Sequence, residues 1–316
     1  MESGMEMEGP GWRCLWYAKA TLGESTLYDS RDGRIYWVDV ENPSINWIDI
    51  ETEEKGRWVP PMWISALGLR SKGGFIASTR DGLAYVNPTT ETFELFADPR
   101  PNREVARLND GVVDHKGRYW TGSCDVTQFE DSTTSENKED SVRDFDKRST
   151  GELYRIDPDG TIATMERNVV TANGPAFSPD GKTIYVNDSL PRVTWAYDLA
   201  EDGSISNRRD WLKYGEDDGF PDGMAVDVEG GIWIAFYESW MLRRYSPDAV
   251  LLEERRLPVR QGLRPAFGGA HMERLFLTSA ANALSEEAKA QQPLAGSLFE
   301  ILDPAVRGMP NVAFAG

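Results

Sequence analysis

The chain of 316 residues has few of the side chains on which many active sites depend, since it contains two histidines and two cysteines. A Ser-His-Asp triad would have to use His115 or His271. Both lie in turn or loop sequences, so we expect neither to be a catalytic base. Cys14 and Cys124 cannot supply a four-ligand zinc site and are expected to be reduced thiols. The motifs typical of α/β-hydrolases, P-loop proteins, zinc metalloproteases and dinucleotide-binding folds are absent.

Positive charge and long apolar runs are also scarce. Lysine and arginine total 34 against 52 acidic residues, which gives a formal net charge of −18. This balance argues against a nucleic-acid partner, because phosphate contacts need clustered cations. No run of residues has the length of a membrane span, and the acidic start lacks the apolar region of a signal peptide. We therefore expect a cytoplasmic protein that binds no membrane and is a monomer or a weak homodimer.

A pair of strands is repeated along the chain, and each pair turns at a glycine. Four clear units turn at Gly33, Gly117, Gly181 and Gly230, and two degenerate units lie near Gly74 and Gly268. Most units are about 40 to 50 residues apart, the length of a four-stranded propeller blade. Helical periodicity is confined to a short segment at 285–291. The sequence predicts an all-β, six-bladed β-propeller with four-stranded antiparallel blades. It forms one domain at 11–316, after a flexible segment at 1–10.

A polar residue precedes each clear turn glycine at nearly constant spacing. Glu24 lies nine positions before its glycine, and Asn109, Asn173 and Asp222 each lie eight positions before theirs. Equivalent positions in successive blades lie on one ring, so these side chains can converge on a central channel. Carboxylate and amide oxygens are the ligands of hard or borderline cations such as Ca²⁺, Mg²⁺ and Mn²⁺. Taken singly, however, Asn or Asp before Gly is more often a turn residue than a ligand.

Several short motifs occur in an order typical of one family. They are Leu22-Gly23-Glu24, Arg107-Leu108-Asn109-Asp110-Gly111, Asn173-Gly174, Pro221-Asp222-Gly223-Met224 and Ala266-Phe267-Gly268-Gly269. In these motifs the chain resembles the SMP-30/gluconolactonase family, from about Leu22 to the C-terminus. The resemblance implies a six-bladed propeller with one divalent metal in its central channel, and it implies hydrolysis of a lactone.

The resemblance also implies roles for single residues. Glu24, Asn173 and Asp222 match metal ligands, and Arg107 and Asn109 match substrate-binding positions. The expected cation is Ca²⁺, with Zn²⁺, Mn²⁺, Mg²⁺ or Fe²⁺ as alternatives, and the expected substrate is a small sugar-derived lactone. Asp222 would also be the general base that activates water. Three alternatives stay open: a phosphotriesterase-like or other ester hydrolase on the same site, a calcium-binding propeller without turnover, and a scaffold propeller.

Two features depart from the family pattern. An acidic, Ser/Thr-rich insertion at about 125–150 replaces the segment in which the family has a substrate-binding acid. Asp125 and Glu130 are candidates for that acid. The insertion is interpreted either as a solvated, disordered loop or as a lid over the channel. Trp240 stands where the family often has glycine, so it is expected either to narrow the pocket or to offer a stacking face.

Three further acidic residues follow predicted strands of the same blades. They are assigned structural roles: Asp39, Glu41 and Asp188.

Overall fold

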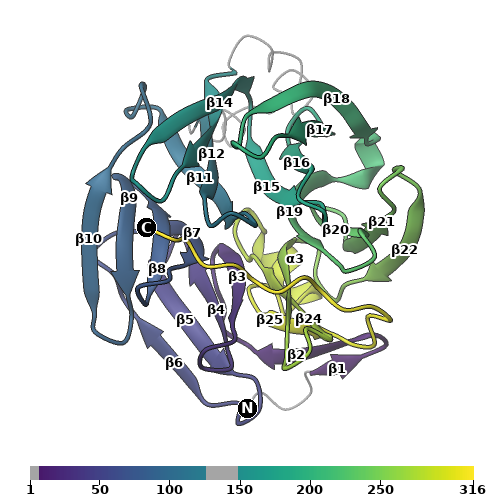
Figure 1. Cartoon of the computed structure of the whole chain (residues 1–316). Helices are drawn as coiled ribbons and strands as arrows, with labels where there is room; N and C mark the ends of the chain where they lie inside the picture. Colours follow the sequence, from purple (N-terminus) through teal and green to yellow (C-terminus); the bar gives the residue numbers. More distant parts are fainter. Residues whose placement is uncertain (1–6, 126–148) are drawn as a thin grey trace. The chain divides into compact units, whose positions relative to one another are not determined.

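The computed structural model describes residues 7–125 and 149–316. Their strands form six antiparallel sheets, five of four strands and one of five (Figure 1). These sheets follow one another along the chain, in agreement with the predicted series of four-stranded blades. Most of the insertion expected at 125–150, including Glu130, lies outside the described residues, so neither interpretation of it is tested.

Contacts divide the chain into two compact units. Unit 1 consists of Met1–Trp63 and Glu216–Asn311, and unit 2 consists of Ile64–Gly215 and Val312–Gly316. Residues 11–316, which we expected to be one domain, are thus distributed over both units. Each unit contains three of the sheets and is described by itself.

Unit 1 contains sheets 1, 5 and 6. Sheet 1 consists of β3 (Gly23–Asp29), β4 (Arg34–Asp39), β5 (Ser44–Asp49) and β6 (Lys55–Trp58). Sheet 5 consists of β19 (Phe220–Val226), β20 (Ile232–Tyr237), β21 (Met241–Tyr245) and β22 (Leu251–Arg256). Sheet 6 consists of β23 (Gly262–Gly268), β24 (Arg274–Ser279), β25 (Leu298–Ile301), β2 (Trp12–Trp16) and β1 (Glu8–Gly9).

Unit 2 contains sheets 2, 3 and 4. Sheet 2 consists of β7 (Ile64–Leu69), β8 (Phe75–Thr79), β9 (Gly82–Asn87) and β10 (Thr92–Ala97). Sheet 3 consists of β11 (Ala106–Val113), β12 (Tyr119–Asp125), β13 (Gly151–Ile156) and β14 (Ile162–Val169). Sheet 4 consists of β15 (Ala172–Phe177), β16 (Thr183–Asp188), β17 (Val193–Leu199) and β18 (Ile205–Lys213).

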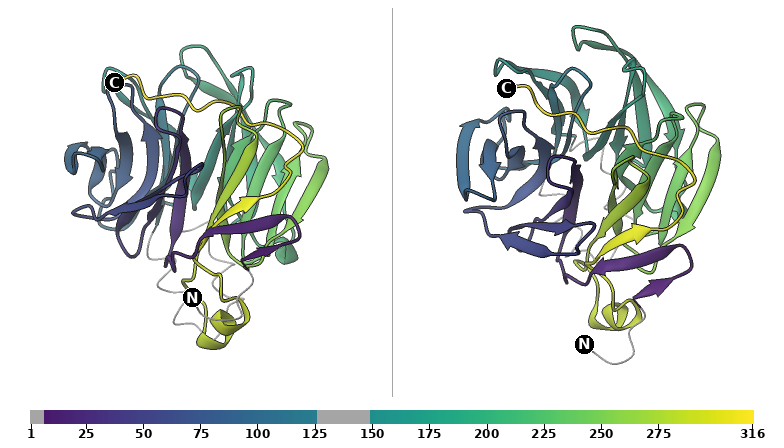
Figure 2. Two further views of the ribbon diagram at one scale, coloured as in Figure 1. Left: turned by 90° about the horizontal axis from the view of Figure 1, so that it is seen from below. Right: turned by 60° about the horizontal axis from the view of Figure 1, so that its bottom comes forward.

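Sheet 6 joins the two ends of the described chain. Strand β2 pairs with β25, so Trp12 lies opposite Ile301. In the N-terminal segment expected to be flexible, Glu8–Gly9 instead form β1 and pair with β2. Between β24 and β25, helix α3 (Glu286–Gln291) projects beyond the strand ends (Figure 2). Its N-cap is Ser285, and its range agrees with the helical segment predicted at 285–291. A short 3-10 helix, η2 (Glu216–Asp218), precedes β19.

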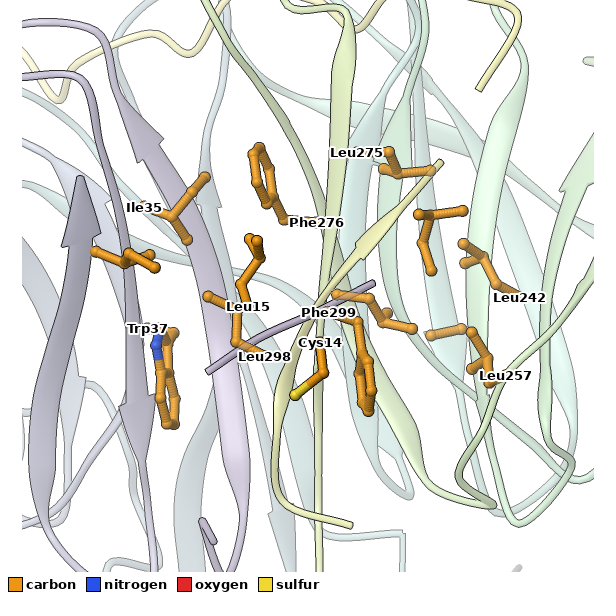
Figure 3. Packing of buried hydrophobic residues seen from close by; sticks show 14 of the residues in the cluster. Cys14, Leu15, Ile35, Trp37, Leu242, Leu257, Leu275, Phe276, Leu298 and Phe299 are labelled. Carbon is orange, nitrogen blue, oxygen red and sulfur yellow. The ribbon is translucent and has the colours of Figure 1, made fainter. Parts of the chain in front are cut away.

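Each unit has a core of aromatic and aliphatic side chains from its strands. Figure 3 shows the core of unit 1, in which Trp37, Phe276 and Phe299 pack together with aliphatic neighbours. In unit 2, Trp120 and Phe314 are fully buried. Burying one such side chain stabilises the fold by about 2 kcal/mol or more. No helix in the described residues is long and apolar enough to cross a membrane.

Buried aspartates fix two of the predicted turns. Asp114 accepts hydrogen bonds from the backbone N–H of Arg118 at 3.0 Å and from Trp120 Nε1 at 2.8 Å. Asp227 likewise accepts from Trp233 Nε1 at 3.0 Å in sheet 5. The turn glycine that follows each aspartate in the same turn, Gly117 or Gly230, has the positive φ that glycine adopts most easily. One carboxylate thus ties each turn to the strand that follows it.

Candidate functional site

Each sheet has a β-bulge near the start of its first strand. In sheet 1, Glu24 lies opposite Val38 and Leu27 opposite Tyr36, so two residues on β3 face one on β4. The register shifts at the corresponding place in β7, β11, β15, β19 and β23. Bulges change the direction in which side chains point and recur next to functional sites. This irregularity therefore marks one end of every sheet.

All four residues of the predicted ring lie at these bulges. Asn109 and Asp222 are the first residues of their bulges, whereas Glu24 and Asn173 come one position before theirs. The spacing to the turn glycine identified the correct end of each strand. It could not reveal this one-residue difference, because the number of residues in a bulge is not visible in the spacing.

Two of the four, Asn109 and Asn173, are in direct contact within unit 2. Asn109 Nδ2 donates to Asn173 Oδ1 at 2.6 Å and to the Ala172 carbonyl at 3.0 Å. Asn173 Nδ2 donates to Ser189 Oγ at 2.8 Å. Both amide nitrogens therefore bind protein acceptors, and the amide oxygens keep lone pairs for a ligand. Asn173 is 7% exposed, so its orientation is well fixed.

Asp110 and Ser65 fix the backbone around this pair. Asp110 accepts hydrogen bonds from the backbone N–H of Gly111 at 2.8 Å and of Gly174 at 3.0 Å, which links sheet 3 to sheet 4. Ser65 Oγ donates to the Asn109 carbonyl at 2.9 Å. Sequence reasoning missed both roles. Asp110 was visible as the middle residue of Asn-Asp-Gly, but Ser65 lies in the degenerate second repeat.

The two carboxylates, Glu24 and Asp222, belong to unit 1. Asp222 is 7% exposed and Glu24 is half-buried. A glycine adjoins each, and both glycines lie against sheet 6: a Cβ on Gly23 would meet the Ser279 carbonyl at 2.6 Å, and one on Gly223 would meet the Leu263 carbonyl at 2.8 Å. Neither position has room for a side chain. Glycine therefore brings the backbone of both acidic residues against the same sheet.

Asp39 and Asp188 hold the backbone just before a site residue in each unit, consistent with the structural roles assigned to them. Asp39 accepts from the backbone N–H of Thr21 at 2.9 Å and of Leu22 at 3.1 Å. Asp188 accepts from the N–H of Thr171 at 2.8 Å and also from Val170. Burial raises the pKa of Asp188 to about 6, although these hydrogen bonds oppose the shift.

Arg107, the predicted substrate-binding cation, lies on β11 opposite Cys124 on β12. Its Nε donates to Cys124 Sγ at 3.4 Å. Cys124 is fully buried, and burial raises the pKa of its thiol. Both cysteines are free thiols, as expected. The two histidines, His115 and His271, are exposed, in keeping with the turn positions predicted for them.

Asp125 ends β12 and is 5% exposed. Its Oδ2 accepts a hydrogen bond from Thr150 Oγ1 at 3.0 Å. This contact connects the two described ends of the insertion. The other candidate for the substrate-binding acid, Glu130, lies in the part of the chain that the structure does not describe.

Trp240 and Glu41 make contacts that the sequence did not indicate. Trp240 has a φ of +66°, which explains why glycine suits this position. Its ring is 5.7 Å from the guanidinium of Arg256 on β22, the last strand of sheet 5, whereas Asp222 lies on the first. This contact tests neither the narrowing role nor the stacking role expected of Trp240. Glu41, which was assigned a structural role, is exposed and accepts a hydrogen bond from Asn282 Nδ2 at 2.9 Å.

The predicted ligands fit a hard divalent cation by their chemistry. Among the described residues, no group of three or more His, Cys, Asp or Glu side chains could hold a metal ion. The predicted set has two carboxylates and completes its oxygen donors with amides, of which Asn173 presents Oδ1. Such a set suits Ca²⁺, Mg²⁺ or Mn²⁺ better than a soft metal.

Comparisons with known proteins agree with the sequence motifs. The family model for the SMP-30/Gluconolactonase/LRE-like region matches residues 22–281. The chain belongs to this family. It is 31% identical over 288 residues to a 6-deoxy-6-sulfogluconolactonase from Pseudomonas putida, and the match covers 91% of this chain and 93% of that enzyme.

Solved structures of the same fold cover nearly the whole chain. A luciferin-regenerating enzyme is 26% identical, with a TM-score of 0.84 over 96% of this chain and 99% of its own. A calcium-binding regucalcin from Agrobacterium tumefaciens is 24% identical, with a TM-score of 0.86 over 96% and 97%. The fold is therefore a six-bladed β-propeller, as predicted.

Proposed function

We propose that the protein is a metal-dependent lactonase that hydrolyses a small, sugar-derived lactone to the hydroxy acid. The observation that carries this proposal is the orientation of Asn109 and Asn173, whose amide nitrogens bind protein acceptors, while Asn173 Oδ1, which accepts from Asn109, keeps a second lone pair for a ligand. The relative from Pseudomonas putida, whose name describes a lactonase, supports the reaction class. Two free, buried thiols support a reducing, cytoplasmic location.

Glu24, Asn173 and Asp222 would hold one divalent cation, with Ca²⁺ as the first choice. Two of these residues belong to unit 1 and one to unit 2. The proposal that they share one cation rests on the family match and on their common position at the bulges. When bound, the cation supplies a Lewis acid that polarises the lactone carbonyl and stabilises the developing oxyanion. Zn²⁺, Mn²⁺, Mg²⁺ and Fe²⁺ are the alternatives to be assayed.

The protein's own groups complete the reaction. Asp222 takes a proton from the attacking water as its oxygen bonds to the carbonyl carbon. The bond from that carbon to the ring oxygen then breaks, and the proton passes to the released alkoxide. Arg107 and Asn109 orient the substrate oxygens so that the water meets the carbonyl carbon.

A chelation experiment on a panel of lactones tests the proposal. Protein shown by elemental analysis to be metal-free should hydrolyse no lactone, and activity should return with one or more of the five cations. Full activity in the metal-free protein would overturn the metal role. Calcium binding without lactone turnover would favour a non-catalytic calcium-binding propeller. Metal-dependent hydrolysis of phosphotriesters in place of lactones would favour the other hydrolase.

A further inference from the structure

Three polar side chains of unit 1 form a hydrogen-bonded chain. Tyr237 Oη donates to Asn282 Oδ1 at 3.3 Å, and Asn282 Nδ2 donates to Glu41 Oε1 at 2.9 Å. The three residues come from three different sheets or their loops: Glu41 follows β4, Tyr237 ends β20 and Asn282 follows β24. We call them the polar rim.

The polar rim lies at the same strand ends as the two carboxylates. Glu24 on β3 lies opposite Val38, which is three residues before Glu41. On β19, Asp222 follows Phe220 by two positions, and Phe220 lies opposite Tyr237. Asp222 also affects Tyr237 electrostatically, as one of the charges that raise its pKa. The polar rim and the proposed metal ligands of unit 1 are therefore neighbours.

Hydrogen bonding within the polar rim uses the Tyr237 proton and one of the two Asn282 Nδ2 protons, and it leaves mostly acceptors. The Tyr237 hydroxyl donates its proton to Asn282, so its remaining capacity is to accept. Asn282 Oδ1 and the Glu41 carboxylate, which is exposed, also keep lone pairs. Desolvation raises the pKa of Tyr237, so the hydroxyl keeps its proton at any ordinary assay pH. A ligand suits these groups when it brings hydrogen-bond donors, together with an acceptor for the second Asn282 N–H, as a hydroxyl-rich ring does.

The charges around the polar rim are mainly negative. Glu238, Asp222 and Glu41 all act on Tyr237, and one cation, Arg260, opposes them. Arg260 lies 3.3 Å from Glu238 in an ion pair. Because Asp222 is a proposed ligand of the cation and Glu238 is paired with Arg260, Glu41 is the charge that would repel an anionic substituent on the ligand, whereas a neutral hydroxyl would meet no such repulsion.

We propose that the polar rim of Glu41, Asn282 and Tyr237 is a specificity element that binds ring hydroxyls of a neutral, polyhydroxylated lactone and disfavours anionic ones. This inference rests on the proposed lactonase function, because it assigns the rim to the same site. It gives a role to the hydrogen-bonded chain of Tyr237, Asn282 and Glu41 beside the proposed ligands of unit 1.

The test compares Tyr237→Phe, Asn282→Ala and Glu41→Gln in the full-length protein. For each variant, kcat/KM is measured with a neutral aldonolactone and with δ-valerolactone, which has the reacting ester but no hydroxyls. The ratio of the two values should fall about 10-fold, the effect of losing one or two hydrogen bonds. Tyr28→Phe is the matched control: it changes the same group in unit 1 near the opposite end of β3, and its ratio should stay unchanged.

A binding measurement separates this inference from the proposed function. Calorimetry with a non-hydrolysable aldonolactam reports on the polar rim without turnover, and Tyr237→Phe should weaken this binding by about 10-fold. If the wild type hydrolyses no lactone but the variant loses lactam affinity, the polar rim stands and the lactonase proposal fails. If the wild type hydrolyses lactones and neither the ratio nor lactam binding changes, the polar rim is overturned.

Two further outcomes also decide the question. Equal losses with both lactones, accompanied by a lower Tm, would show that the three residues only connect loops, and this would overturn the inference. With Glu41→Gln, an aldonolactone bearing a 6-sulfonate should gain in kcat/KM relative to the neutral one. A wild-type preference for the sulfonated lactone would contradict the proposed discrimination.

Discussion

The two units supply different chemistry at the same end of their sheets. Unit 1 supplies carboxylates, Glu24 and Asp222, whereas unit 2 supplies amides, Asn109 and Asn173. The amides are fixed by hydrogen bonds to each other and to Ala172 and Ser189. In the proposed metal site, the negative charge would thus come from residues of one unit and the oriented neutral oxygens from residues of the other. We infer that the first governs how strongly a cation binds and the second governs its coordination geometry.

The same backbone arrangement supports both kinds of ligand. Asp39 in unit 1 and Asp188 in unit 2 each end the second strand of a sheet and hold the chain that enters the first. Glu24 and Asn173 follow these anchored segments within a few residues. In both units, therefore, an aspartate holds the backbone just before the site residue. The residue at that site position is a carboxylate in sheet 1 and an amide in sheet 4.

The largest effect is expected from removing charge in unit 1. Asp222→Asn keeps the shape of the side chain but removes both its charge and its basicity. It should lower kcat/KM by about 10³-fold or more and deplete the bound metal, measured by elemental analysis. Glu229→Gln, at an exposed acid of the same sheet, should change neither. Normal turnover in Asp222→Asn would show that unit 1 does not supply the essential charge.

A second change tests the support of the amide pair in unit 2. Because the pKa of Asp188 is raised from 3.8 to about 6, the folded protein keeps a proton that the unfolded chain has released between these pH values. The resulting stabilisation is complete below pH 3.8 and is lost as the pH rises through 6, with a magnitude of up to about 3 kcal/mol. Asp188→Asn should remove this dependence, measured by urea unfolding from pH 4 to 7.

The control for Asp188 is Asp180, whose pKa is shifted in the opposite direction. A hydrogen bond from Ser178 lowers the pKa of Asp180 in the same sheet, so its contribution is present above its ordinary pKa and is lost as the pH falls. Asp180→Asn should leave the slope between pH 4 and 7 unchanged. An equal slope in wild type and Asp188→Asn would show that Asp188 is ionised in the folded protein throughout this range.

Changes to the amides should be milder than those to the carboxylates. Asn109→Ala removes the donor that orients Asn173 and should weaken metal binding by about 10- to 100-fold, as loss of a group behind a ligand typically does. Competition with a chelating dye measures this affinity. Loss of metal as complete as in Asp222→Asn would abolish the distinction between the two units, since the amide would then matter as much as the charge.

The smallest effect is expected at Arg107. Arg107→Ala should leave the metal content intact and raise KM about 10-fold, because it removes binding that ground and transition states share. Cys124→Ser keeps a small acceptor beside the Arg107 Nε and serves as the control. Metal loss in Arg107→Ala would place this residue among the groups that hold the ligands of unit 2.

The sequence predicted the repeated fold, which the structure confirms, whereas the functional site stays a prediction. Turn glycines such as Gly117 and the polar residue before each of them were enough to identify blades and strand ends. The bulges were not visible, so Glu24 and Asn173 appeared equivalent to Asn109 and Asp222 although they lie one position earlier. The polar rim was missed because Glu41, Tyr237 and Asn282 lie at the ends of strands from three different sheets, and their contacts exist only after the sheets have packed.

Sheet 6 constrains how the molecule can be made. Because β2 pairs with β25, its assembly brings together residues that are nearly the whole chain apart, and no contact formed earlier can replace this pairing. Closing so long a loop is entropically costly and slow, so we expect sheet 6 to form last. A ribosome would have to synthesise almost the entire chain before β2 meets its partner. Until then, β2 lacks its partner β25 and exposes an unpaired edge, and this interval is when the nascent protein is most prone to aggregate.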